Sequence, residues 1–144
     1  MSMIDKKNEI RYFLAIDFGK SRVGLATADS ETRISFAYKT LKNDHDFFQN
    51  LAEIINEKNI KTVIVGVPTC LNREKIEYDG ETLGKKMKEV MPFLEVDYQN
   101  EMFTTKIAQR NLIEKGIKKI KKHDDQEAAR IILQSWLDKK YEKL

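Results

Sequence analysis

The chain has 144 residues, of which 41% are hydrophobic and 34% are charged, and its formal net charge is +3. This length fits a single domain over residues 1–144 with a substantial core, and the apolar content excludes a disordered chain. The single cysteine excludes an internal disulfide, and no apolar segment approaches the roughly 18 residues that a membrane-spanning helix needs.

The first third of the chain predicts three strands. Residues 11–17 form an apolar run with aromatic and branched members, which indicates a buried strand. A turn around Gly19 leads into a second strand at 22–28, and residues 35–41 predict a weaker third strand. Short connections between these runs predict an antiparallel meander.

Helices and strands alternate in the rest of the chain. Apolar residues at helical spacing predict a helix near 47–55, and the run at 61–67 predicts the strongest buried strand. The later predicted elements are a loop at 68–80, a helix at 81–90, a strand at 94–99, a helix at 104–116 and a helix at 124–140. We therefore expect an α/β fold, in which a mixed five-stranded sheet has helices on both faces.

The last predicted helix begins with acidic residues. Asp124 and Glu127 have the spacing of a capping box, which predicts the start of the helix. At about 100° per residue, Asp125 lies in line with Ala129 and Ile132. An acid therefore heads the apolar stripe of this helix.

Three acids occupy positions where a charge is costly to bury. Asp17 ends an apolar strand, Glu101 follows another strand, and Asp125 heads the apolar stripe. If the three converge, they form an all-oxygen site of the kind that Mg²⁺ or Mn²⁺ prefers and that suits phosphoryl transfer. Each acid also has a simpler explanation, as a turn residue, an exposed loop acid and a partner of the helix dipole respectively.

Four stretches together resemble the YqgF-type, or RuvX-like, family of candidate pre-16S rRNA nucleases. They are AIDFGKSRVGLATAD, VIVGVP, NEMFTT and LIEKGIKKIKKHDDQEAARIILQSWLD, which follow one another in order over nearly the whole chain. The resemblance implies an RNase H-like fold related to Holliday junction resolvases. It also implies that Asp17, Glu101 and Asp125 are catalytic acids that bind Mg²⁺ or Mn²⁺, and that the protein cleaves phosphodiester bonds in structured nucleic acid.

The resemblance implies maturation of the 5′ end of pre-16S rRNA, and the older assignment, resolution of branched DNA, stays open beside it. The chain departs from the family pattern at Asn100, where an acid is usual, and at Met102, where an arginine is usual. The predicted loop at 68–80 also differs from the short family pattern. These differences bear on substrate contacts more than on the metal site.

Two groups of basic residues flank the predicted acids. One lies in the turn after Asp17, and the other runs just ahead of Asp125. The predicted nucleic-acid contacts are Lys20, Arg22, Lys118, Lys119, Lys121 and Lys122. Lysine and arginine contacts to phosphates supply affinity that depends on salt and little on sequence. The alternative for these lysines is a solvated surface.

Two other functions fit parts of the sequence. A sugar-kinase or actin-like ATP-binding fold also opens with an acid and a glycine turn, but it needs two such domains. A non-catalytic ribosome-assembly or transcription factor could keep the fold and bind nucleic acid without cutting it.

A monomer suits RNA trimming, whereas a homodimer suits paired cuts in branched DNA. The N-terminus has mixed charge and no apolar signal sequence, so we expect a cytoplasmic protein that has no membrane partner.

Overall fold

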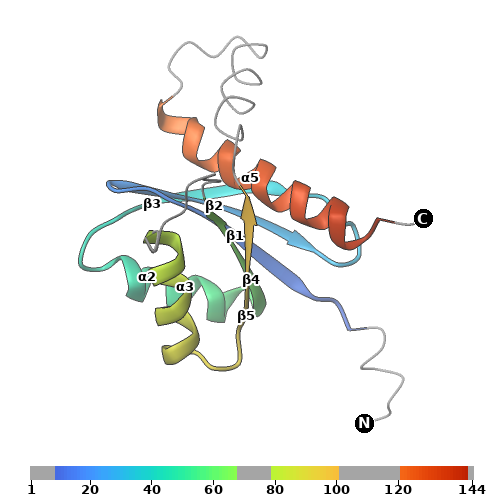
Figure 1. Ribbon diagram of the computed structural model, residues 1–144, viewed down its shortest axis with the longest axis horizontal. Helices are drawn as coiled ribbons and strands as arrows, with labels where there is room; N and C mark the ends of the chain where they lie inside the picture. The colour runs from blue at the N-terminus through green and yellow to red at the C-terminus, as the bar shows by residue number, and fades with distance from the viewer. Residues whose placement is uncertain (1–8, 68–78, 101–120, 143–144) are drawn as a thin grey trace, which may run out of the picture.

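Five strands form one mixed sheet in the computed structural model, which describes residues 9–67, 79–100 and 121–142 (Figure 1). The strands are β1 (Tyr12–Phe18), β2 (Arg22–Asp29), β3 (Phe36–Lys42), β4 (Ile60–Val67) and β5 (Glu95–Asn100). Their order across the sheet is β3-β2-β1-β4-β5. The first three strands pair antiparallel, whereas β1, β4 and β5 run parallel. The predicted meander and the mixed sheet are confirmed.

Helices cover both faces of this sheet (Figure 1). The described helices are α2 (Phe47–Glu57), α3 (Asp79–Val90) and α5 (Lys121–Lys140). Helices α2 and α3 pack on one face and α5 crosses the other, so the predicted α/β layering is confirmed. The helix predicted at 104–116 lies outside the described residues. None of the helices in the described part is long and apolar enough to cross a membrane.

Strand β1 is buried on both faces, and alternate residues enter different cores. Leu14 and Ile16 belong to the core beneath α2 and α3, whereas Phe13 and Ala15 belong to the core beneath α5. Because side chains alternate along a strand, Asp17 follows Phe13 and Ala15 onto the α5 face. The run of apolar residues therefore places its terminal acid on the face that α5 covers.

Strand β2 differs sharply in side-chain size between its two faces. Val23 and Leu25 enter the core with α2 and α3. Ala26 and Ala28 face α5, and Gly24 shares their alternation. Small residues leave room for the backbone of α5 to lie close to the sheet.

Two predicted helix starts are wrong. Helix α5 begins at Lys121, three residues before Asp124, so Asp124 is not an N-terminal cap and the predicted capping box does not form. Neither glycine nor proline interrupts 121–124, and lysine is a good helix former. Glu127 is instead buried and pairs with Arg130 one turn along the helix. Helix α3 likewise begins at Asp79, two residues before its predicted start.

Candidate metal and nucleic-acid site

Asp17 and Asp125 come from distant parts of the sequence, and both lie next to Gly24. Asp17 pairs directly with Gly24 across β1 and β2, so both residues point to the α5 face. A β-carbon added at Gly24 would overlap the carbonyl group of Asp125 and lie 2.9 Å from its β-carbon. Directly opposed β-carbons in a sheet are about 5 Å apart. The two acids are therefore neighbours at one edge of the sheet.

Arg22 lies beside Asp125 on the same face. Its Nε is 3.1 Å from Oδ2 of Asp125, and the two side chains are 44% and 23% exposed. Arg22 stands two residues before Gly24 on β2, which explains why it projects toward α5 as well. The contact of this guanidinium with nucleic acid stays a prediction, and in the structure the guanidinium pairs with the Asp125 carboxylate.

The turn between β1 and β2 is tight and is held from outside by Asn43. The Gly19 amide donates to the Arg22 carbonyl at 3.0 Å, which closes the hairpin over Lys20 and Ser21. The Asn43 side-chain amide donates to the Gly19 carbonyl at 2.8 Å, and its backbone amide donates to the Ser21 carbonyl at 2.9 Å. Two hydrogen bonds from one residue fix the loop that carries Lys20 and leads into Arg22.

Glu101, the third predicted acid, lies outside the described residues. Strand β5 ends one residue earlier, at Asn100, and β5 runs parallel to β1 through β4. The carboxyl ends of these strands therefore share the edge at which Asp17 lies. Among the described residues, no three acidic, histidine or cysteine side chains form a metal-binding group. The described part of the site thus supplies two carboxylates, both with the hard oxygen donors that Mg²⁺ and Mn²⁺ prefer.

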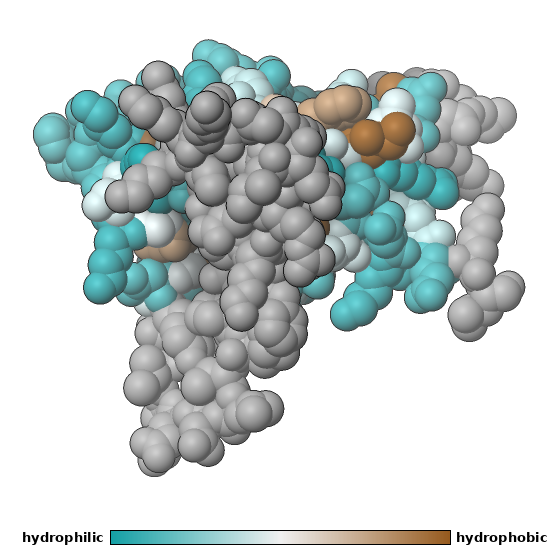
Figure 2. Space-filling model, turned by 90° about the horizontal axis from the view of Figure 1, so that it is seen from above, coloured by the Kyte–Doolittle hydropathy of each residue, from teal (hydrophilic) through white to brown (hydrophobic). Residues whose placement is uncertain are grey.

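The predicted basic contacts are described to different extents. Lys20 is exposed at the tip of the β1–β2 turn. Lys118 and Lys119 lie outside the described residues, and only the backbone of α5 is described at Lys121 and Lys122. Seen from above, the coloured residues in Figure 2 are mostly hydrophilic, with a hydrophobic patch at the upper right.

Trp136 is a contact between α5 and the sheet, away from the paired acids. Its ring packs against Phe13 with centroids 5.3 Å apart, and its indole N–H donates to Oδ2 of Asp97 on β5 at 2.8 Å. The Asp97 contact shows that alternate residues of β5 face α5, the same face to which Asp17 points. Trp136 is partly buried and packs against the core beneath α5.

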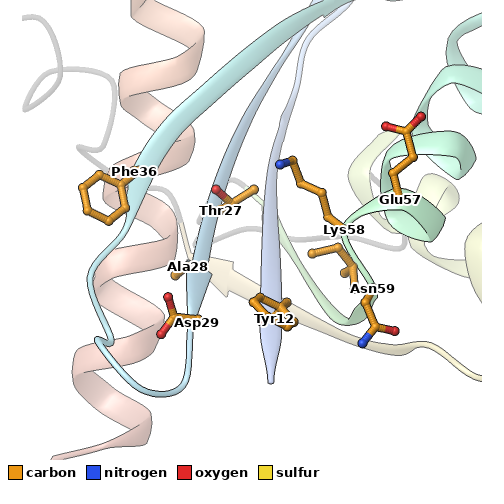
Figure 3. Close-up of a pocket in the computed structure, with 9 residues that line it drawn as sticks. Tyr12, Thr27, Ala28, Asp29, Phe36, Glu57, Lys58 and Asn59 are labelled. Atoms are coloured by element: carbon orange, nitrogen blue, oxygen red, sulfur yellow. The ribbon is translucent and has the colours of Figure 1, made fainter. Parts of the chain in front are cut away.

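A pocket of 580 Å³ lies at the other end of the sheet (Figure 3). It is lined by the first residue of β1, the last residues of β2 and the C-terminal end of α2, with Tyr12 and Phe36 partly exposed. Tyr12 and Asp17 are five residues apart on one strand, which corresponds to about 17 Å. The pocket is therefore separate from the paired carboxylates.

Two residues that shape the site were not predicted from the sequence. Gly24 interrupts a strand pattern, and an isolated glycine in a strand is a signal of close backbone approach that could have identified it. Asn43 gives no such signal. It acts on the turn through hydrogen bonds to residues more than twenty positions earlier, which no local pattern reveals.

Known proteins match this chain over most of its length. The profile of the RuvX family, described as Holliday junction resolvase, matches residues 11–139. A protein of Bacteroides fragilis named as a candidate pre-16S rRNA nuclease is 30% identical over 133 residues, which covers 88% of this chain and 96% of that protein. A protein of Porphyromonas gingivalis with the same name is 33% identical, and the match covers 87% of this chain and 94% of that protein. A protein of Cutibacterium acnes, again with the same name, is 34% identical, and the match covers 87% of this chain and 81% of that protein.

Two solved structures share the fold at low sequence identity. The fowlpox virus resolvase in complex with Holliday junction DNA superposes with a TM-score of 0.60 at 12% identity, covering 91% of this chain and 99% of that one. RuvC of T. thermophilus in complex with a Holliday junction substrate superposes with a TM-score of 0.59 at 15% identity, covering 91% and 96%. These likenesses confirm the expected RNase H-like fold.

Proposed function

The chain belongs to the RuvX family, and we propose that it is a metal-dependent nuclease that hydrolyses phosphodiester bonds in pre-16S rRNA at its 5′ end. The observation that carries this proposal is that Gly24, the strand partner of Asp17, lies directly against the backbone of Asp125 at one edge of the sheet. A shared metal ion would account for two acids on one face from positions more than a hundred residues apart. Relatives at 30% identity or more over most of the chain are named for this RNA substrate.

The acids fit a hard divalent cation. Asp17 and Asp125 offer carboxylate oxygens. Glu101 is the residue that follows β5 in the sequence, and β5 ends at the same edge of the sheet. We assign these three residues as ligands for Mg²⁺ or Mn²⁺. When bound, such an ion acts as a Lewis acid that polarises a phosphate oxygen. The rigid sheet and helix hold the carboxylates in place, which favours catalysis by orientation.

The basic residues around the acids suit a phosphate backbone. Arg22 is partly exposed beside Asp125, and a guanidinium can grip a phosphate through two parallel hydrogen bonds. Lys20 projects from the turn that Asn43 fixes. The lysines at 118, 119, 121 and 122 lie three to seven residues before Asp125 in the sequence and extend the positive charge. Together these side chains orient the substrate, and their contacts carry little sequence preference.

Branched DNA is the second candidate substrate. The family description names Holliday junction resolvases, so a four-way DNA junction belongs in the same assay.

A nuclease of ribosomal precursors works where ribosomes are assembled, and we accordingly propose a cytoplasmic location. The two substrates also imply different oligomeric states, because paired cuts in a junction need the two active sites of a dimer whereas RNA trimming needs only the one of a monomer.

The test is cleavage by the purified full chain with Mn²⁺ or Mg²⁺. A 16S precursor RNA and a four-way DNA junction are offered side by side, with and without a chelator. The variant Asp17→Asn removes a proposed ligand, and Asp29→Asn is the matched control at the far end of β2. Asp29 caps the turn after β2 through an oxygen that asparagine keeps, so the control retains this contact.

We expect the wild-type chain and Asp29→Asn to cleave the RNA in the presence of metal, and Asp17→Asn to be inactive. Matched cuts in the DNA junction without cleavage of the RNA would identify branched DNA as the substrate. Equal turnover in Asp17→Asn and the wild type would overturn the assigned site. Tight RNA binding without cleavage by any of the proteins would identify a non-catalytic binding factor.

A further inference from the structure

Gly24 occupies a position at which glycine is not needed for backbone geometry. Its φ lies outside the left-handed region, so an alanine can adopt the same backbone conformation. Glycine in the middle of a strand costs stability relative to alanine, by about 0.5–1 kcal/mol. A glycine here therefore has a reason outside the strand itself. A close approach by another backbone is the usual one.

The approaching backbone belongs to Asp125. A β-carbon at Gly24 would overlap the Asp125 carbonyl carbon and oxygen. Both are main-chain atoms of a helix, so no side-chain rotation can relieve the overlap. The first described turns of α5 would have to move away from β2.

The same glycine pairs with Asp17. Their α-carbons are direct partners across β1 and β2, so Gly24 stands between the strand that carries one acid and the helix that carries the other. The neighbouring residues on this face, Ala26 and Ala28, are small but do carry a β-carbon. The close approach of α5 to β2 at Gly24 thus coincides with the position of the two acids.

We propose that Gly24 is a positioning residue: its missing side chain lets α5 approach β2 closely enough to hold the Asp125 carboxylate beside Asp17. This inference rests on the proposed metal site. It assigns to Gly24 a role that acts through Asp125, and it predicts a change in metal affinity that a purely stabilising residue would not cause.

The variant Gly24→Ala tests this role. We expect Mn²⁺ affinity, measured by titration of the full chain without nucleic acid, to fall by about 10–100-fold, as for changes to groups that orient metal ligands. We expect cleavage of precursor RNA to fall by about 10²-fold, because displacement of a catalytic group by about 1 Å has an effect of this size. Circular dichroism and thermal unfolding report whether the protein stays folded.

A matched control adds bulk beneath the same helix away from the acids. Ala28→Val faces α5 four residues beyond Gly24 and is also buried. It should lower stability without changing Mn²⁺ affinity.

If Gly24→Ala does not fold, Ala129→Val replaces it, because Ala129 lies one helical turn after Asp125 on the buried side of α5. A valine there pushes the same part of the helix away from the sheet, and Mn²⁺ affinity should again fall.

A double variant separates position from stability. Asp125→Glu adds one methylene and should weaken Mn²⁺ binding in the wild type, because the carboxylate then extends too far. In the Gly24→Ala background the same change should raise Mn²⁺ affinity several-fold, since the longer side chain spans the added distance. General destabilisation cannot produce opposite signs in the two backgrounds.

The outcomes distinguish this inference from the proposed function. Mn²⁺ binding that is lost in Gly24→Ala and restored by Asp125→Glu supports the positioning role even if no RNA is cleaved. Wild-type cleavage with unchanged Mn²⁺ affinity in a folded Gly24→Ala overturns the positioning role and leaves the nuclease intact. Equal losses of affinity in Gly24→Ala and Ala28→Val, or a wild-type chain that binds no Mn²⁺, would also overturn it.

Discussion

On strand β2, the face toward α2 and α3 carries Val23 and Leu25, whereas the face toward α5 carries Gly24, Ala26 and Ala28. Large side chains bury much apolar surface and hold a helix at a distance. Small ones bury less, but they allow backbones to approach. We infer that one face chiefly stabilises the fold and that the other sets the position of the acids.

The largest expected effect is on the α5 face. Asp125→Asn removes one carboxylate charge, and metal-dependent cleavage should fall by about 10³-fold because a metal ion supplies several kcal/mol to such reactions. The free energy of unfolding should change by about 1 kcal/mol or less, since the pair with Arg22 is partly exposed. Cleavage kinetics and urea unfolding of the same sample measure both quantities. A large loss of stability together with full activity would reverse the assignment of the two faces.

The opposite result is expected on the α2 and α3 face. Leu25 is fully buried there, and Leu25→Ala should lower the free energy of unfolding by about 2–5 kcal/mol through lost burial and a cavity. At a temperature where the variant is folded, its turnover per folded molecule should match the wild type. Urea unfolding and cleavage rates corrected for the folded fraction provide the check. A selective loss of turnover would show that both faces position the acids.

A smaller effect is expected at the turn that joins the two strands. Asn43→Ala removes the side-chain hydrogen bond to the Gly19 carbonyl but keeps the backbone bond to Ser21, and it should cost about 0.5–1.5 kcal/mol of stability. The looser turn should weaken RNA binding several-fold through Lys20. Filter binding over a range of salt concentrations measures this, with Asn43→Asp as the comparison that keeps the side-chain size. Unchanged binding in Asn43→Ala would remove this turn from the substrate surface.

The smallest expected effect lies on the α5 face but far from the acids. Trp136→Phe keeps a ring against Phe13 and removes the indole hydrogen bond to Asp97, which is exposed, so the cost should be about 0.5 kcal/mol. Cleavage and Mn²⁺ affinity should stay at wild-type values. Thermal unfolding and Mn²⁺ titration test this. Loss of metal binding here would mean that the whole of α5, and not only its contact at Gly24, sets the site.

The sheet and its layers could be predicted because burial leaves a periodic trace in the sequence. The run from Phe13 to Ile16 is apolar at every position, and this is the expected pattern of a strand covered on both faces. The start of α5 was predicted wrongly because Asp124 and Glu127 have capping spacing, whereas the helix continues back to Lys121. A local motif cannot exclude a longer helix when the preceding residues also favour one.

The candidate site could be predicted only in part. Asp17 and Asp125 stood out because each ends or heads an apolar pattern, and the structure brings the two together. The pairing of Arg22 with Asp125 and the hydrogen bonds of Asn43 could not be read from the sequence. Both depend on how distant segments dock, and docking leaves no periodic pattern. The roles of the acids as metal ligands stay a prediction until cleavage and metal binding are measured.

Periodicity and motifs are local properties of the chain, so the strand and helix pattern, the family resemblance and the acids worth testing could all be read from the amino-acid sequence. The position of Gly24 next to both Asp17 and Asp125, with Arg22 beside Asp125, became visible only in the folded domain. The register of β1 against β2 and the docking of α5 on small residues create this arrangement. A contact between backbones depends on the packing of the whole domain, and no single segment encodes it.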